Sequence, residues 1–487
     1  MTKKEFKRAM VCGLGRCIQA LDMEEDIEKY QDIILWGCTH EIFYDAQCEG
    51  TKSSYLYEMV KHYQDVSPFV EAVIACAKRQ MTKTSSLFLQ CCEFLGFFGS
   101  DGDERARHAL YGIYDDLYQI IMHKRKRTKY GLFPERDNFE HLCIEIVNMG
   151  NTKEACIHAY CKIVEDVGTL MMSASLIDSW DFMWFQSCWK DELGEKRLHG
   201  ILEKRAKKSE AVQYYLEAIQ QRQQDMENRS ANRRKLPKTA KEIYDKLAQG
   251  GKVGVIGYDI PIAIVWMWAR DRQEQEIKRL AQYHKKEKDV EIRAQLTRLL
   301  AREQSAYLLD VDILLEDCKS ENKLLQEYAF EALSYIRHKK VRAYAFELLG
   351  DVKDPVNILK KATQLEYFES VFVMLIYNYE KEDESWFVEA VKAIPVLRSE
   401  KINWHSIYMD IRHIFENKRV DSPPKEILYH MYEYSQCACC REFIVREMSR
   451  RRMLTDELLQ ECLHDSYSYI REFAEKKWKT RQRRREI

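Results

Sequence analysis

The sequence predicts an all-α protein, and two observations carry this prediction. Glycine and proline number 18 and 8 among 487 residues, together about 5% of the chain against roughly 12% in average proteins. Apolar residues recur at three- and four-residue spacing along almost the whole chain, as at Ile292, Leu296 and Leu299, which is the pattern of amphipathic helices. Because breakers such as Pro134 and Gly150 separate these stretches, we expect short helices joined as hairpins.

The overall composition is that of a globular protein. The chain has 77 Lys and Arg against 78 Asp and Glu, a net charge of −1, and 46% hydrophobic residues. It has no apolar run of about 18 residues that could span a membrane, and its first residues lack the apolar region of a secretion signal. Its 16 cysteines are therefore expected to be reduced thiols. We predict a cytoplasmic protein without a membrane partner.

Three regions are expected along the chain. Residues 1–220 form an N-terminal helical, repeat-like region, 221–241 a polar linker or long solvated loop, and 242–487 a C-terminal repeat region. The middle stretch is assigned by its composition, since it offers few apolar side chains to bury. The alternative is that the preceding helix continues through it as far as Pro237.

The C-terminal half contains an internal repeat. Nine-residue segments starting at 292, 325, 341, 440 and 470 align without gaps. Their shared pattern is an aliphatic residue, then Arg, two variable residues, and a small or apolar residue. The arginines include Arg293, Arg342 and Arg471, while Asp289 precedes the first segment and Asp465 the last.

This pattern resembles the HEAT and HEAT-like family, in which an Asp before the second helix and an Arg near its start stack as a ladder between repeats. The resemblance covers 285–355 and 430–479 directly. It implies an α-solenoid of HEAT-like antiparallel helical pairs, with the repeat arginines at junctions between pairs. Stacked pairs share a continuous core and leave one concave face for a partner.

The segment 37–52 has the densest mixture of reactive side chains. On a helix, His40, Tyr44 and Cys48 would form one row, and Asp45 and Glu49 would belong to an adjacent acidic row. His40, Asp45 and Glu49 are therefore weak catalytic candidates for acid–base chemistry, and Tyr44 is a binding candidate. The alternative is a helix whose His and Tyr cap the core and whose acids are solvated. The segment also resembles the opening of some uncharacterised bacterial helical-repeat proteins, which brings no assigned activity.

Two aromatic clusters offer further binding candidates. Trp180 and Trp184 lie four residues apart among acidic residues, and Trp266, Trp268 and Arg270 fall within one short stretch. Such side chains can stack on a nucleic-acid base or anchor a peptide, although they can equally fill helix–helix interfaces. The second stretch is loosely similar to HEAT-like alkylpurine DNA glycosylases, but no residue of that family can be carried over.

No metal or cofactor is expected. Cys437, Cys439 and Cys440, with Cys462 and His464 further along, could offer thiolate and imidazole ligands, but two spaced pairs of zinc ligands are absent. On one helix these three neighbouring cysteines cannot all face one ion. The glycine-rich stretch 250–257 lacks the Lys and Ser or Thr that end a phosphate-binding loop.

These observations favour a non-enzymatic scaffold that uses the concave face of a helical solenoid to bind a macromolecule, most favourably a protein. Basic runs lie at 124–127, 233–235, 450–452 and 479–486, and arginines bind phosphates well. The alternative is therefore a HEAT-like nucleic-acid-binding protein, with glycosylase-like base excision as one form of it. A small-molecule enzyme that uses the 37–52 segment is a third hypothesis.

Overall fold

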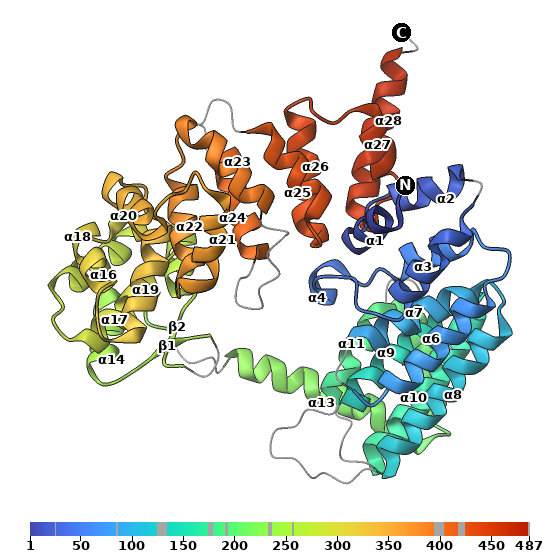
Figure 1. Ribbon diagram of the computed structural model, residues 1–487. Helices are drawn as coiled ribbons and strands as arrows, with labels where there is room; N and C mark the ends of the chain where they lie inside the picture. The colour runs from blue at the N-terminus through green and yellow to red at the C-terminus, as the bar shows by residue number, and fades with distance from the viewer. Residues whose placement is uncertain are drawn as a thin grey trace. The chain divides into compact units, whose positions relative to one another are not determined.

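The computed structural model describes the chain except for residues 25, 84–85, 124–133, 174–178, 190–192, 232–235, 256–257, 394–403, 417–423 and 486–487 (Figure 1). The described residues form α-helices, short 3₁₀ turns and one pair of two-residue strands. The predicted all-α class is therefore confirmed. In this described part, no helix is long and apolar enough to cross a membrane.

The chain divides into two compact units. The first unit consists of Met1–Arg233 together with Ser435–Ile487, and the second unit is Arg234–Tyr434. The division expected from the sequence placed its linker at 221–241 and assigned the last residues to the C-terminal region. In the structure, α13, which begins at Glu210, continues into the polar stretch as far as Ala231, and the last segment packs with the N-terminal helices.

The first unit contains the following helices, with a 3₁₀ turn at Glu28–Tyr30: α1 (Lys3–Cys12), α2 (Arg16–Met23), α3 (Gln31–Cys38), α4 (Ala46–Glu49), α5 (Ser53–Val60), α6 (Ser67–Gln80), α7 (Ser86–Ser100), α8 (Glu104–His123), α9 (Pro134–Asn148), α10 (Lys153–Ser173), α11 (Ser179–Trp189), α12 (Glu195–Ala206), α13 (Glu210–Ala231), α26 (Ala438–Arg450), α27 (Asp456–Cys462) and α28 (Ser468–Arg485).

The second unit contains the following elements, with 3₁₀ turns η3 (Ala306–Leu308) and η4 (Lys381–Asp383): α14 (Ala240–Ala248), β1 (Val253–Gly254), β2 (Ile260–Pro261), α15 (Ile264–Arg270), α16 (Glu274–Lys286), α17 (Val290–Leu300), α18 (Val311–Asp317), α19 (Lys323–Ser334), α20 (Lys339–Leu349), α21 (Pro355–Gln364), α22 (Phe368–Tyr377), α23 (Glu384–Ala393), α24 (Trp404–Glu416) and α25 (Lys425–Tyr434). The two strands are parallel, with Val253 opposite Ile260.

Helices of the second unit pack in two rows. In the row that we call the central row, α17 packs on α19, α19 on α22, and α22 on α24. The other row runs through α18, α20, α21, α23 and α25, and it contacts the central row through pairs such as α18 with α19. The apolar faces meet between the helices, where Ala294, Leu325 and Tyr328 form a buried cluster.

Four arginines share one position, the fourth residue of their helix. They are Arg293 in α17, Arg342 in α20, Arg441 in α26 and Arg471 in α28. Three of them form ion pairs with an aspartate further along the chain, at 2.8 Å (Arg293 with Asp317), 2.6 Å (Arg342 with Asp383) and 2.8 Å (Arg441 with Asp465). Arg471 instead donates to the backbone oxygen of Asp465 at 2.7 Å.

The N-terminal and C-terminal helices of the first unit meet at Arg441. Both Arg441 and Asp465 have fully buried side chains, joined by two hydrogen bonds of 2.8 and 3.1 Å. Next to this pair, the Ser466 N–H donates to the Gly13 carbonyl oxygen at 2.9 Å. Gly13 adopts a φ of +76°, and a Cβ there would lie 2.0 Å from the Ser466 hydroxyl oxygen. Glycine is therefore required where these segments cross.

We expect the Arg441→Ala substitution to lower the free energy of unfolding by about 3–5 kcal/mol, because Asp465 would remain buried without its charge partner. Denaturant titration followed by circular dichroism measures this loss. The matched control is Arg446→Ala on the same helix, whose side chain is 44% exposed and pairs with Glu442 at 2.7 Å. Its expected loss is below about 1 kcal/mol. Equal losses would contradict the structural role of Arg441.

Candidate functional site

A cluster of titratable side chains lies on the central row of the second unit. We call it the Tyr–His–carboxylate cluster, and its members are Glu303, Tyr335, Tyr377, Asp410 and His413. They come from the carboxyl ends of three neighbouring helices, α17, α19 and α22, and from the facing helix α24. Such helix ends carry partial negative charge from unpaired carbonyl groups, so the surroundings favour positive charge.

His413 is the centre of the cluster. Its Nε2 atom shares a hydrogen bond of 3.1 Å with the Tyr377 hydroxyl, and the two rings lie 4.7 Å apart. Nδ1 lies 3.7 Å from a Glu303 carboxylate oxygen, and Nε2 lies 3.9 Å from an Asp410 carboxylate oxygen. Tyr335 contacts Tyr377 edge to face, with ring centroids 5.6 Å apart. The imidazole is therefore held between two carboxylates and a phenol.

The carboxylates of this cluster are crowded and only partly solvated. The pKa of Asp410 is raised to about 6, mainly by burial, while Arg412 opposes the rise and Glu303 and Glu369 add to it. Burial is also the main reason that the pKa of Tyr377 is raised, with the charges of Glu303 and Asp410 adding to it. A positive charge placed here would relieve both effects. Chemically, the cluster can hold a cation or exchange a proton near neutral pH.

Sequence reasoning missed this cluster. The only local signal is that Asp410 and His413 stand three residues apart on one helix, which places them on the same face. Glu303, Tyr335 and Tyr377 come from segments more than thirty residues away along the chain. Only the packing of four helices brings these groups together.

The candidates in segment 37–52 do not lie on one helix, contrary to the expected geometry. α3 ends at Cys38, and only the four residues of α4 are helical further on. His40 turns back to its own helix, where Nδ1 lies 2.8 Å from the Trp36 carbonyl oxygen and its ring stacks on Trp36. No described contact joins it to Asp45 or Glu49.

The Glu49 side chain joins two backbone segments through hydrogen bonds. One carboxylate oxygen accepts the N–H groups of Tyr44 at 2.5 Å and Asp45 at 3.3 Å. The other oxygen accepts the N–H of Ala438 at the start of α26. The Tyr44 side chain is 44% exposed. This network fixes the loop after α3 against α26, and whether these residues also carry chemistry stays a prediction.

The aromatic candidates separate into surface and core. Trp266 is 52% exposed, and the Arg270 guanidinium lies 5.3 Å above its ring. Trp268, two residues on, is only 4% exposed and belongs to the core. Trp180 and Trp184 lie on α11, but their side chains fall outside the described residues. Among the candidates whose side chains the structure describes, it thus brings together Trp266 and Arg270.

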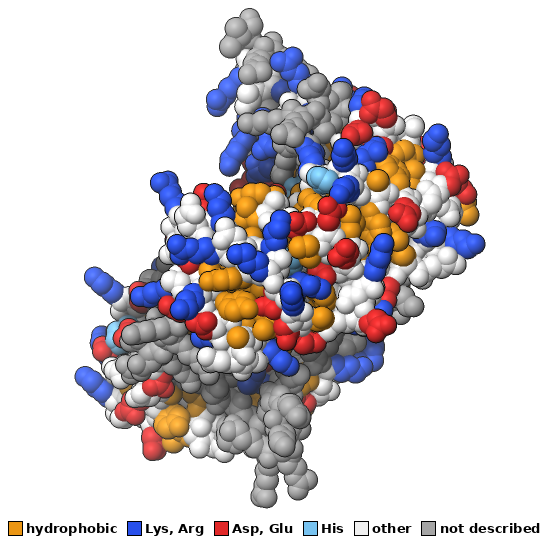
Figure 2. Space-filling model, turned by 90° about the vertical axis from the view of Figure 1, so that its left-hand side faces the viewer, with side chains coloured by type: hydrophobic (Ala, Val, Ile, Leu, Met, Phe, Trp, Pro, Cys, Tyr) orange, Lys and Arg blue, Asp and Glu red, His pale blue; other side chains and the backbone are white. Residues whose placement is uncertain are grey.

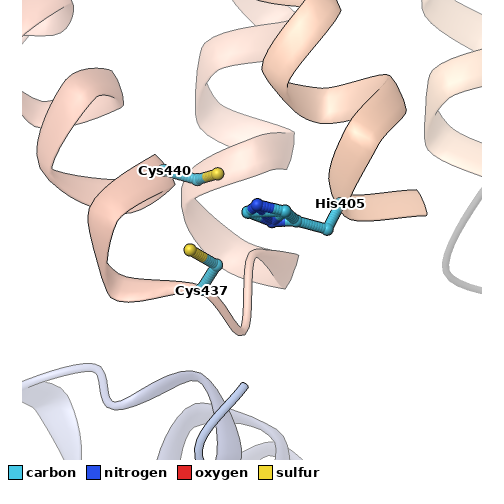
Figure 3. A group of neighbouring side chains, drawn as sticks. All are labelled: His405, Cys437 and Cys440. Carbon is cyan, nitrogen blue, oxygen red and sulfur yellow. The ribbon is translucent and has the colours of Figure 1, made fainter. Parts of the chain in front are cut away.

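Two of the cysteines considered as metal ligands begin a helix. Cys437 is the N-cap of α26 and Cys440 its third residue. Their sulfur atoms lie within 4.8 Å of each other, and both side chains are buried. Figure 3 draws this pair together with His405 of α24. His405 belongs to the second unit and the cysteines to the first, so no metal centre is assigned.

The basic runs are largely occupied by ion pairs where the structure describes them. Arg450 and Arg451 both bind the Glu447 carboxylate at 2.9 Å, and Arg481 binds Asp456 at 2.5 Å. The runs at 124–127 and 233–235, and the side chains of residues 484–487, lie outside the described residues. On the face drawn in Figure 2, basic side chains are interspersed with acidic and apolar ones.

A groove of about 520 Å³ lies between α8, α9 and α10 of the first unit, lined in part by Arg107, Tyr111, His158 and Lys162. Its cations already have partners, because Lys162 bonds to Asp166 at 2.6 Å and Arg107 to Glu104 at 3.0 Å. The Tyr–His–carboxylate cluster therefore offers the more distinctive chemistry.

Comparisons with known proteins add no family. No protein-family model matches this sequence, and no curated protein matches it. Among solved structures, a crystal structure of an engineered protein is similar over 98% of both chains, with 14% sequence identity and a TM-score of 0.27. A TM-score of this size does not show a shared fold. Function is therefore inferred from the residues of this chain.

We expect the Asp410→Asn substitution to stabilise the protein at pH 7.5. Because the pKa of Asp410 rises from 3.8 to about 6 on folding, stability falls as the pH rises between those values, and the loss is complete above pH 6. Removing the charge should raise the free energy of unfolding by about 1–3 kcal/mol at pH 7.5 and change it little at pH 3.5. Denaturant titrations at both pH values measure the difference.

The control for this prediction is Asp312→Asn. The Asp312 side chain is 66% exposed and pairs with Lys340, so its neutralisation should give no gain at either pH. If Asp410→Asn raised the free energy of unfolding equally at both pH values, the prediction would be wrong. The charge of Asp410 would then not be what destabilises the folded state.

Proposed function

We propose that the protein is a non-enzymatic, cytoplasmic scaffold of HEAT-like helical pairs that binds another macromolecule, a protein rather than a nucleic acid. The observation that carries the proposal is the shared fourth-residue position of Arg293, Arg342, Arg441 and Arg471. In HEAT-like proteins, an arginine near the start of a helix pairs with an aspartate between successive repeats. Three of the four arginines here pair with an aspartate in the same way.

The packing of the second unit supports the same proposal. In the central row, α19 and α22 pack against the other row as well as against their neighbours in their own row. In a stack of helical pairs, the remaining side forms one long surface across successive repeats. Surfaces of this kind bind extended segments of other macromolecules, and the residues on them decide which kind.

The Tyr–His–carboxylate cluster supports a protein partner that presents Lys or Arg. Glu303 and Asp410 supply negative charge, and Tyr335 and Tyr377 supply ring faces on which a cation can rest. The helix ends add to the negative potential. We propose that a basic segment of the partner binds at this cluster, where its charge relieves the mutual repulsion of the carboxylates.

A nucleic-acid-binding surface would instead require a row of unpaired Lys and Arg side chains that can contact successive phosphates. The ion pairs of Arg450, Arg451 and Arg481 with glutamate or aspartate argue against it, because these arginines would have to exchange their carboxylate partners for phosphates.

We expect Glu303→Lys to weaken partner binding on the order of tenfold, because it reverses one charge of the proposed site. The test captures partners of the tagged full-length protein from nuclease-treated extract of its native host and measures the affinity of the purified partner. The Glu303 side chain is 52% exposed, so the folded state should tolerate the change. The matched control is Glu321→Lys, an exposed residue in the turn before α19.

Equal weakening by both charge reversals would contradict the proposed site while leaving the scaffold proposal intact. Loss of the captured partner after nuclease treatment would overturn the choice of a protein partner. So would submicromolar binding of RNA or DNA that falls steeply between about 50 and 150 mM salt, since that slope reports released counterions.

A further inference from the structure

A pair of thiols lies at the start of helix α26 in the first unit. Cys437 is the N-cap of this helix and Cys440 is its third residue, so two residues separate them. Their sulfur atoms lie within 4.8 Å of each other, and Figure 3 draws the two side chains on the same side of the first turn. Cysteine pairs with this spacing at a helix start are typical of dithiols that alternate between a reduced and a disulfide form.

The backbone at this pair suits a disulfide. Cys437 has a φ of −71° and a ψ of 120°, which is an extended conformation, and Cys440 lies within the first helical turn. Residues three apart in a helical turn have Cα atoms about 5 Å apart, inside the range of roughly 4.4–6.8 Å that a disulfide requires. The two sulfur atoms can therefore meet by rotation of their side chains, without movement of the helix.

Hydrogen bonds hold the turn before the pair in place. The Ser435 hydroxyl donates to the Cys437 carbonyl oxygen at 3.3 Å, and the Arg441 guanidinium donates to the Ser435 carbonyl oxygen, also at 3.3 Å. The Gln436 side-chain amide donates to the Ile42 carbonyl oxygen at 3.3 Å. Because the chain is already ordered here, a disulfide loses little of the chain entropy that otherwise opposes ring closure.

Cys439 lies between the two cysteines but its side chain is directed elsewhere. Its sulfur atom lies 3.7 Å from the Cys48 carbonyl oxygen and 3.7 Å from the Tyr467 hydroxyl oxygen, so it contacts α4 and the segment before α28. Successive residues of a helix point about 100° apart, which accounts for the separate direction. Cys439 therefore provides an internal control for the pair.

We propose that Cys437 and Cys440 form an intrachain disulfide when a small hydroperoxide oxidises the protein, which makes the start of α26 a redox site. Exposed fractions of 6% and 3% for the two residues limit the oxidant to a small molecule such as hydrogen peroxide. Cys437 is the more exposed of the two and reacts first. This inference does not depend on the proposed binding function.

The chemistry balances in two steps. The Cys437 thiol loses its proton, and the thiolate attacks one oxygen of hydrogen peroxide. The O–O bond breaks, and the hydroxide that leaves takes up a proton to become water, so that Cys437 becomes a sulfenic acid. The Cys440 thiol then loses its proton, and its sulfur attacks the Cys437 sulfur. The S–S bond forms, the S–O bond breaks, and the second hydroxide takes up a proton and leaves as water. Two thiols are oxidised while one peroxide is reduced.

The test treats the reduced full-length protein with hydrogen peroxide and locates the oxidised cysteines by mass spectrometry. The protein is then unfolded, alkylated with iodoacetamide, reduced and labelled with N-ethylmaleimide, so that only oxidised cysteines carry the second label. Trypsin releases the three cysteines in one peptide, residues 426–441, and fragmentation assigns the label on each. We expect N-ethylmaleimide on Cys437 and Cys440, the iodoacetamide label on Cys439, and a loss of two free thiols per chain.

Single variants complete the test. Cys439→Ser should retain the disulfide. Cys440→Ser should lose it and leave Cys437 as a sulfenic acid, which dimedone labels. Cys437→Ser should also lose the disulfide and remain folded by circular dichroism, because serine is a favoured N-cap residue. A disulfide that joins Cys439 to Cys48 or to either member of the pair would overturn the assignment. So would a wild-type protein that keeps Cys437 and Cys440 reduced, or a disulfide that persists in Cys440→Ser.

Discussion

The first unit depends on one buried ion pair, between Arg441 and Asp465. Neither side chain has any exposed surface, so each charge has given up its hydration and is stabilised by the other. Further hydrogen bonds join Arg441 to Ser435 and Ser466, and the Tyr467 N–H to Asp465. An ion buried in this way without its partner destabilises a protein by several kcal/mol. The pair therefore requires that α26 and the segment before α28 keep their positions, and Gly13 and Ser466 then bring the N-terminal helices against them.

The same Arg–Asp contact recurs in the second unit, where the side chains are less completely buried. Asp317 and Asp383 have side chains that are 2% and 7% exposed, while their arginine partners are 23% and 24% exposed. A helical side chain points toward the start of its own helix, so an arginine in fourth position can reach an acid beside that helix start. The fourth position of the helix thus supplies the same contact at Arg293, Arg342 and Arg441.

Sequence alone predicted what is local and missed what is distant. The spacing of apolar residues predicted the helices, and the aligned segments singled out Arg293 and Arg342. In segment 37–52, where α3 ends at Cys38 and α4 is a separate short helix, sequence reasoning gave no sign that Glu49 binds the N–H of Ala438, 389 residues away. It also missed the surroundings of His413, because Glu303 and Tyr377 come from segments far away along the chain.

Glu49 and Asp410 have different roles: Glu49 is a structural carboxylate, and Asp410 is a candidate functional one. Both are carboxylates beside other polar groups, but Glu49 accepts three backbone N–H groups and so fixes the loop after α3 against α26. The pKa of Asp410 is raised mainly by burial, and Glu303 and Glu369 add to the rise while Arg412 opposes it, so its charge is held at a cost. A fold gains nothing from that arrangement by itself. A cation from outside removes the cost, which is why the cluster around His413, rather than the denser segment 37–52, carries the proposed binding function.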